Sequence, residues 1–280
     1  MLRWIDTHCH LDAHEFGALA HTLRAEAATL GVAKCVLPAV EPGNFAAVQD
    51  LAKSLGDGYC LGIHPLYVAR VGMDALAVLD SALHRHQHDP HLLAVGEIGL
   101  DLFDPALRQS PLREQQIRFF VEQLKLARRY QLPVVLHSRH AVDGVCKALR
   151  DVAGPGGRWQ GIAHAFNGSF QQAQTLMAMG FKLGFGGAMT FDRALQLRRL
   201  AASLPLEAIV LETDAPDMPP HWRYTPVARR MGGEMQGLNS PAELPHIGEV
   251  LAQLRAQPVA DIAAQTTLNA LAALPRLQHI

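Results

Sequence analysis

Short apolar runs alternate along the chain with longer stretches in which apolar residues recur every three to four positions. The runs are typical of buried parallel strands, and the longer stretches are typical of helices that cover such strands. We predict eight strands, at residues 4–10, 34–40, 59–65, 92–99, 133–137, 161–164, 182–187 and 208–214. Helices are predicted between them, at 15–30, 45–55, 73–86, 142–152 and 170–179, from 111 onward and through 199. The helix that begins at Pro111 is expected to bury Ile117, Phe120, Val121 and Leu124.

This alternation predicts the fold class. A strand, a helix and a second strand form a right-handed βαβ unit, and eight such units close into a barrel. We therefore expect a TIM-like (β/α)8 barrel, with extra C-terminal helices at 241–254 and 259–274 on its outside. No Gly/Ser-rich or Pro-rich linker interrupts the pattern, so the chain is predicted to be a single domain over 1–280.

Composition narrows the classes of partner. Lys and Arg total 25 against 26 Asp and Glu, a net charge of −1, whereas tight non-specific duplex binders are usually basic. Any contact with nucleic acid is therefore expected to be local. The four cysteines are scattered through apolar runs, which favours buried thiols in a reducing compartment. Without a signal peptide or an apolar run of membrane-spanning length, we expect a cytoplasmic monomer with no membrane partner.

Side chains able to bind metal collect at the predicted strand ends. His8 and His10 alternate along the first strand, so they share one face. Other strands end in or carry His64, Glu97, His137, His164 and Asp214. Each of these taken singly is expected to be an ordinary hydrogen-bonded residue. In a barrel, however, the carboxyl ends of the strands build the active site together. Imidazoles and carboxylates suit divalent ions, so we predict ligands for one or two metals at His8, His10, Glu97, His137, His164 and Asp214.

Five motifs then resemble one known family. They are Asp6-Thr7-His8-Cys9-His10-Leu11-Asp12, Gly62-Ile63-His64-Pro65, Val95-Gly96-Glu97-Ile98-Gly99-Leu100-Asp101, Leu136-His137-Ser138-Arg139 and Leu211-Glu212-Thr213-Asp214-Ala215-Pro216. In this order the motifs closely resemble the TatD family of metal-dependent deoxyribonucleases, which lies within the amidohydrolase-like barrels. The resemblance runs from residue 3 to 269.

The resemblance implies a role for each matched residue. His8 and His10 would hold the more buried metal, and Glu97 would bridge two metals. His137 and His164 would bind the second metal, and Asp214 would be both ligand and catalytic base. His64 and Asp101 would face the substrate. The chain departs from the family pattern at Leu66, Ala165, Asn167 and Leu238, none of which is a metal ligand.

The expected function is hydrolysis of DNA phosphodiester bonds, from the 3′ end of single strands, with two ions of Mg²⁺, Mn²⁺ or Zn²⁺. Asp214 and Glu97 are the expected catalytic residues, and Asp214 would accept the proton of the attacking water. Residues 216–241 are either a lid over the site or an exposed connector. Arg139, together with Arg223 and Arg229 of that segment, would contact phosphates.

Two other functions fit the same sequence. A metal site of this kind also hydrolyses esters and amides, including the aminoacyl ester of a mischarged tRNA, as a D-aminoacyl-tRNA deacylase does. The chain would alternatively be a binding protein with a relic metal site. The complete set of candidate ligands argues against that second alternative.

Overall fold

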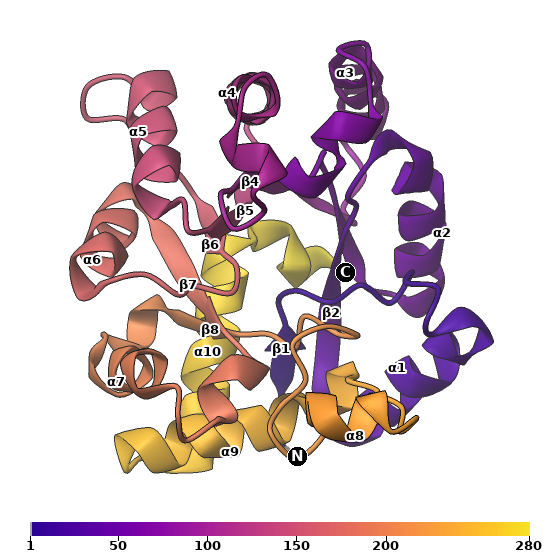
Figure 1. Ribbon diagram of the computed structural model, residues 1–280, viewed down its shortest axis with the longest axis vertical. Coiled ribbons are helices and arrows are strands. Elements are labelled where there is room, and N and C mark those ends of the chain that lie inside the picture. The colour runs from indigo at the N-terminus through magenta and orange to yellow at the C-terminus, as the bar shows by residue number, and fades with distance from the viewer. Residues whose placement is uncertain (1) are drawn as a thin grey trace. The chain divides into compact units, whose positions relative to one another are not determined.

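The computed structural model describes residues 2–280, in which strands and helices alternate (Figure 1). The strands are β1 (Trp4–Asp6), β2 (Val32–Pro38), β3 (Gly58–Leu61), β4 (Leu92–Asp101), β5 (Val134–Arg139), β6 (Gly161–Ala163), β7 (Phe181–Phe185) and β8 (Ile209–Leu211). The helices are α1 (Ala20–Thr29), α2 (Phe45–Leu55), α3 (Ala75–His86), α4 (Leu112–Tyr130), α5 (Val142–Ala153), α6 (Phe170–Met179), α7 (Leu195–Ser203), α8 (Val227–Met231), α9 (Leu244–Arg255) and α10 (Val259–Ala273).

The strands pair in chain order from β1 to β8, and the registered pairs from β1 to β7 are parallel. The sheet also closes on itself. The backbone N–H of Thr7, directly after β1, donates to the carbonyl oxygen of Leu211 in β8 over 3.1 Å. The (β/α)8 barrel predicted from the sequence is therefore confirmed, as are the two C-terminal helices α9 and α10.

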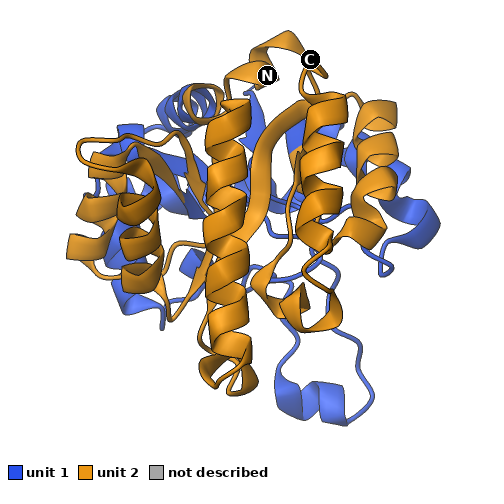
Figure 2. Ribbon diagram, turned by 90° about the horizontal axis from the view of Figure 1, so that it is seen from above, with its two compact units in different colours: residues 1–35, 184–269 blue, residues 36–183, 270–280 orange. Residues whose placement is uncertain are grey.

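The chain divides into two compact units, coloured separately in Figure 2. Unit 1 comprises Met1–Cys35 and Gly184–Asn269, and unit 2 comprises Val36–Leu183 and Ala270–Ile280. The prediction of a single domain over 1–280 stays a prediction. Within unit 1, α9 packs against β1 and β8. Gly248 permits this packing, because a Cβ atom there would lie 2.4 Å from the indole ring of Trp4.

Unit 2 is organised around β4, whose ten residues are all buried. Such a continuous buried run is typical of a parallel strand that is covered on both faces. Helix α4 packs on β4 and buries Phe119, Phe120 and Leu124 against it. The predicted inner stripe is wrong at two positions, because Ile117 is 40 % exposed and Val121 is only half-buried.

Several predicted strands are longer than the observed ones. β1 ends at Asp6, β3 at Leu61 and β8 at Leu211, so the candidate site residues that follow these strands lie on loops. Regular ladder pairing with the neighbouring strand ends there, although single backbone hydrogen bonds continue beyond it, and an apolar run does not reveal this boundary. Glu97 and His137 do lie within strands, β4 and β5.

The helices of residues 2–280 include none with both the length and the apolar character needed to cross a membrane. All four cysteine side chains are buried, as predicted from their apolar surroundings.

Candidate functional site

The first group of candidate ligands lies in unit 1 and joins the segments that follow β1 and β8. Asp214 donates its backbone N–H to the carbonyl oxygen of His8 over 2.9 Å, and His10 donates to Ala215 over 2.7 Å. These bonds extend the pairing of the two segments beyond the strands. The sequence predicted that His8 and His10 share a strand face. The structure instead brings their side chains together from a loop.

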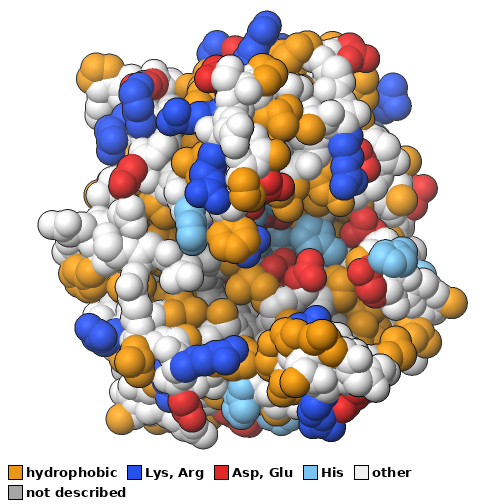
Figure 3. Space-filling view, in the orientation of Figure 1, with side chains coloured by type: hydrophobic (Ala, Val, Ile, Leu, Met, Phe, Trp, Pro, Cys, Tyr) orange, Lys and Arg blue, Asp and Glu red, His pale blue; other side chains and the backbone are white. Residues whose placement is uncertain are grey.

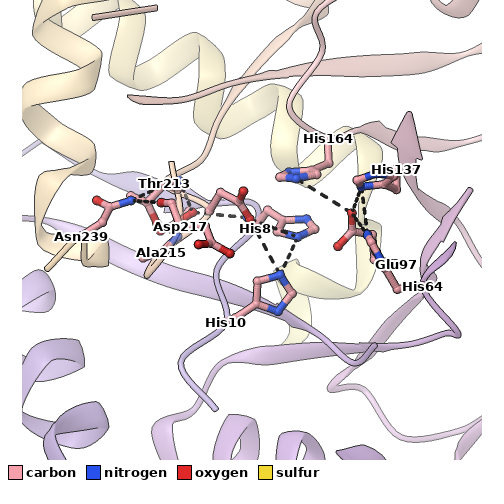
Figure 4. A network of polar contacts seen from close by, with 12 residues as sticks. His8, His10, His64, Glu97, His137, His164, Thr213, Ala215, Asp217 and Asn239 are labelled. Carbon is pink, nitrogen blue, oxygen red and sulfur yellow. Dashed lines mark hydrogen bonds and ion pairs between the residues drawn. The ribbon is translucent and has the colours of Figure 1, made fainter. Parts of the chain in front are cut away.

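The donor atoms of this group converge. The Nε2 atoms of His8 and His10 are 3.2 Å apart, and each lies 3.8 Å from Oδ1 of Asp214 (Figure 4). Ligands that share an ion at about 2.1 Å lie about 3.0–3.5 Å apart in octahedral or tetrahedral geometry. The side chain of His8 is fully buried, while those of His10 and Asp214 are 18 % and 14 % exposed. The spacing of the two imidazoles falls within this range of ligand separations, and Asp214 lies slightly beyond it, so a small shift of its carboxylate would complete a site for one divalent ion.

The carboxylate of Asp6 holds the backbone segments that carry this donor group. Its carboxylate accepts hydrogen bonds from the backbone N–H of His8 at 3.3 Å and from the N–H and hydroxyl of Thr213 at 3.0 and 2.6 Å. Burial raises the pKa of Asp6 to about 7, even though these hydrogen bonds oppose the shift. Cys9 and Cys35 offer sulfur atoms within 4.8 Å of this carboxylate. Because its oxygens are already used by Thr213 and His8, we assign Asp6 a structural role.

The second group lies in unit 2 and is centred on the carboxylate of Glu97. Oε1 of Glu97 is 2.8 Å from Nδ1 of His137, 3.4 Å from Nε2 of His64 and 3.9 Å from Nε2 of His164 (Figure 4). Nε2 of His64 is also 3.0 Å from Nδ1 of His137. The structure thus brings His64, expected to face the substrate, into the same group of donors as Glu97 and His137. These atoms also fit a divalent ion.

Asp101 fixes the orientation of His137. Oδ2 of Asp101 is 3.2 Å from Nε2 of His137, which directs Nδ1 toward Glu97. A carboxylate that accepts a hydrogen bond from the second ring nitrogen of a metal-binding imidazole commonly sets the tautomer of that imidazole. Asp101 is only 1 % exposed, so it acts in this structure through His137 rather than through an open surface. The sequence did not suggest this positioning role.

The same contacts change the acidity of both groups. Burial alone would lower the pKa of His137, but the hydrogen bonds that its ring donates to Asp101 and Glu97 outweigh this effect and raise that pKa. Burial disfavours the ionised form of Asp101, yet the hydrogen bonds from His137 and the loop backbone hold its pKa at about 2. In the metal-free protein the carboxyl of Asp101 is therefore ionised beside His137.

Two buried glutamines of α4 hold the loops that carry these residues. Gln123 accepts from the backbone N–H of Ile63 at 2.7 Å and donates to its carbonyl at 3.0 Å, directly before His64. Gln116 accepts from the backbone N–H of Asp101 at 3.0 Å and donates to Leu107 at 2.6 Å. The sequence analysis missed both. The available signal was two glutamines seven positions apart on the apolar face of a helix.

The segment 216–241 belongs to unit 1 and is anchored at two points. Asn239 donates to the carbonyl oxygens of Thr213 and Asp217 at 2.9 and 2.6 Å, next to Asp214 (Figure 4). Buried Glu243 accepts from the indole N–H of Trp222 and from Nε of Arg223, both at 2.7 Å. These contacts tie the segment to the loop after β8 and to Glu243.

The three arginines expected to contact phosphates already have protein partners. Nε of Arg223 pairs with Glu243, and Nε of Arg229 lies 2.6 Å from Glu234. The guanidinium carbon of Arg139, in unit 2, lies 3.7 Å from the ring centroid of Phe103. Each guanidinium carries five N–H donors, so these contacts leave donors for an anion. Their role in substrate binding stays a prediction.

The family model described as "TatD related DNase" matches residues 5–275. The chain is 40 % identical over 268 residues to the uncharacterized metal-dependent hydrolase YjjV of Escherichia coli K12, covering 95 % of each chain. The crystal structure of YjjV, described as a TatD homolog, superposes with a TM-score of 0.84 at 37 % identity over 98 % of each chain. Human deoxyribonuclease TATDN3 is 29 % identical over 289 residues, covering 99 % of this chain and 96 % of the relative. The chain belongs to the TatD family of metal-dependent hydrolases.

Proposed function

We propose that this hydrolase cleaves phosphodiester bonds of DNA, working from the 3′ end of single strands. The observation that carries the proposal is the pair of donor groups, which contain only imidazoles and carboxylates. Hard and borderline divalent ions such as Mg²⁺, Mn²⁺ and Zn²⁺ bind such donors and serve phosphoryl transfer. The name of human TATDN3, a deoxyribonuclease, supports DNA as the substrate.

We propose two ions rather than one. His8, His10 and Asp214 supply three donors in unit 1, and the Glu97 group supplies its own donors in unit 2. Both groups follow or lie in strands of one sheet, near the carboxyl ends where barrel enzymes assemble their active sites. A carboxylate placed between two ions offsets their mutual repulsion, and we assign this role to Glu97.

The chain's own residues divide the remaining work. When bound, the ions polarise the phosphoryl oxygens and lower the pKa of the water that attacks phosphorus. Asp214 is partly exposed and accepts the proton of that water. Asp101 holds His137 in the orientation that presents Nδ1. The net charge of the chain is −1, so attraction to phosphates needs local positive charge, and Arg139 supplies it.

A metal-by-substrate matrix tests this proposal. The protein is stripped of metal, reloaded separately with Mg²⁺, Mn²⁺ or Zn²⁺, and offered 5′-labelled single-stranded and duplex DNA, RNA, aminoacyl-tRNA and small esters. We expect a ladder of products shortened from the 3′ end of single-stranded DNA, and no products with a chelator. Turnover of aminoacyl-tRNA or small esters without cleavage of DNA would replace the proposed substrate. Full activity of the metal-free protein would overturn the metal chemistry.

A further inference from the structure

An aromatic ring, a guanidinium and an imidazole stack together at the surface of unit 2. The guanidinium carbon of Arg139 lies 3.7 Å from the ring centroid of Phe103, which places the cation over the face of the ring. The ring of His140 meets Phe103 edge-on, with centroids 5.3 Å apart and an interplanar angle of 89°. Phe103 is 48 % exposed, and both Arg139 and His140 are exposed.

This stack is tied directly to the Glu97 group. Arg139 and His137 are two residues apart on β5, so their side chains leave the strand on the same face. Oδ1 of Asp101 accepts the backbone N–H of Phe103 at 2.7 Å, while Oδ2 of Asp101 contacts His137. The backbone N–H of Leu102 also donates to the carbonyl oxygen of Arg139 at 2.8 Å. The stack is therefore fixed at a short distance from the proposed metal ligands.

A second arginine–aromatic pair in unit 2 shows what distinguishes this one. Arg128 lies over Trp159 at 4.0 Å, a similar geometry. Trp159, however, is only 8 % exposed, and its indole N–H donates to the carbonyl oxygen of Leu149. That ring is part of the core. Phe103 contributes little to the core and keeps about half of its surface open beside the Glu97 group.

Exposed aromatic rings next to arginines are the common means of holding unpaired bases, because every base has a π face. A guanidinium that stacks through its face also keeps its N–H edge available for a phosphate. We infer that Phe103, Arg139 and His140 form a stacking platform for one base of a single-stranded nucleic acid, with the adjacent phosphate on the edge of Arg139. This inference rests on the proposed function, and it adds the subsite that holds the substrate.

The test compares substrates with and without bases. One labelled single strand carries natural bases, and a second of equal length carries reduced abasic residues near its 3′ end. Replacing Phe103→Ala is expected to weaken binding of the natural strand about 5- to 100-fold, by fluorescence anisotropy and by KM. The same substitution is expected to change binding of the abasic strand less than twofold. Phe103→Trp should retain the affinity of the parent for the natural strand.

Two further variants separate stacking from charge and from general damage. Arg139→Lys keeps the charge but loses the planar stack, so it should lose affinity for the natural strand while keeping the parent's salt dependence. Phe170→Ala is the control, because it removes a phenylalanine of similar exposure, 46 %. Within residues 2–280 no arginine stacks on the Phe170 ring, so this variant should bind the natural strand as the parent does. Thermal melting of each variant reports whether it folds.

The platform is disproved if Phe103→Ala binds the natural strand as the parent does, or weakens the natural and abasic strands equally. Failure of the proposed function looks different. In that case the metal-loaded parent cleaves neither the natural strand nor a small phosphodiester such as methyl p-nitrophenyl phosphate. Anisotropy still reports in that case whether the Phe103 ring binds a base.

Discussion

Glu97 is the residue around which the histidines of the unit 2 group gather. One of its oxygens lies within 3.9 Å of nitrogens from three histidines, so its negative charge compensates either a protonated imidazole or a metal. In the metal-free protein this contact and that of Asp101 raise the pKa of His137 against the opposing effect of burial. A metal must displace that proton, so we expect metal affinity to fall as the pH is lowered through the raised pKa.

Substituting Glu97→Gln tests the proposed bridging role. The amide keeps the shape of the side chain but removes the charge that offsets two ions, so one metal equivalent should be lost and kcat should fall by orders of magnitude. Asp214→Asn is the matched comparison. It should tend to retain metal while losing activity, because it removes the proposed base. Metal content and single-turnover rates separate the two. If Glu97→Gln binds as much metal as the parent at an unchanged rate, a one-metal site is the better description.

Asp101 should act on metal affinity rather than on substrate. Replacing Asp101→Asn weakens the hydrogen bond that orients His137, and losses of about 10- to 100-fold in metal affinity follow for partners of this kind. Titration of metal-free protein measures the loss, and excess metal should restore most of the activity. Asp104→Asn in the same loop is the control. Within the described residues, the Asp104 carboxylate accepts a hydrogen bond only from the backbone N–H of Ala106. Unchanged metal affinity in Asp101→Asn would remove the positioning role.

The sequence predicted several of the side chains that the structure brings together, but not how they are held. The spacing of His8 and His10 and the expected strand ends at Glu97 and His137 pointed to these donors, whereas His64 was expected to face the substrate. The contacts of Gln116 and Gln123 depend on the rotation of α4 about its axis. They also depend on loops that lie 15 and 60 residues away in sequence, and no local pattern encodes such a relation.

At the scale of elements, the segment 216–241 is held by its own anchors. Glu243 accepts from Trp222 and Arg223, and Asn239 ties the far end of the segment to Thr213. A short helix, α8, which the sequence analysis did not predict, lies within it. Segments with many turns, Pro and Gly show little periodicity of apolar residues. A helix of five residues is too short to produce a helical period.

We predict that Arg223→Ala and Arg229→Ala raise KM and flatten its salt dependence, with a smaller loss of kcat. An arginine that contacts phosphates remote from the reacting bond contributes equally to ground state and transition state. Steady-state kinetics at several salt concentrations measure both effects. Arg199→Ala, which removes an exposed arginine of α7, is the control. If both lid variants match the parent at every salt concentration, the segment is only a connector.

The contact between α3 and α4 predicts a dependence of stability on pH. The hydroxyl of Tyr130 donates to Asp80 at 2.6 Å and Arg129 lies 2.8 Å from it, and these contacts lower the pKa of Asp80. A lowered pKa stabilises the fold above the ordinary carboxyl pKa of 3.8, and this contribution is lost as the pH falls through the lowered pKa. Asp80→Asn should therefore reduce Tm more at pH 7 than at a pH below 3.8. An equal reduction at both pH values would contradict this assignment.

Element boundaries show where local patterns stop being informative. α2 and α6 match their predicted ranges, since Gly56 and Gly180 end them in left-handed conformations that only glycine adopts easily. β3 and β8 are shorter than predicted, because pairing with a neighbouring strand, not the apolar run itself, sets the end of a strand.

At the scale of the whole molecule, positive and negative charges are nearly equal in number. On the face drawn in Figure 3, Lys and Arg side chains are interspersed with Asp and Glu rather than gathered in one patch. The net charge of −1 agrees with this distribution. Under the proposed function, attraction to nucleic acid would come from a few placed groups and from bound cations. This favours recognition of a strand end over binding along a duplex.

Metal binding should also stabilise the whole protein. An ion that binds only the folded state adds RT ln(1 + [M]/Kd), about 2.7 kcal/mol when the free metal concentration is 100 times Kd. At about 2–4 °C per kcal/mol for a chain of this size class, the corresponding Tm shift is about 5–10 °C. We therefore expect a chelator to lower Tm and added Mn²⁺ or Mg²⁺ to restore it, by differential scanning fluorimetry. His137→Ala is the matched control, because it removes a ligand from unit 2 and leaves the donors of unit 1 in place. Its chelator-induced shift should be smaller than the parent's but not zero. A parent Tm that is unaffected by chelator and by millimolar metal would mean that neither donor group binds these ions.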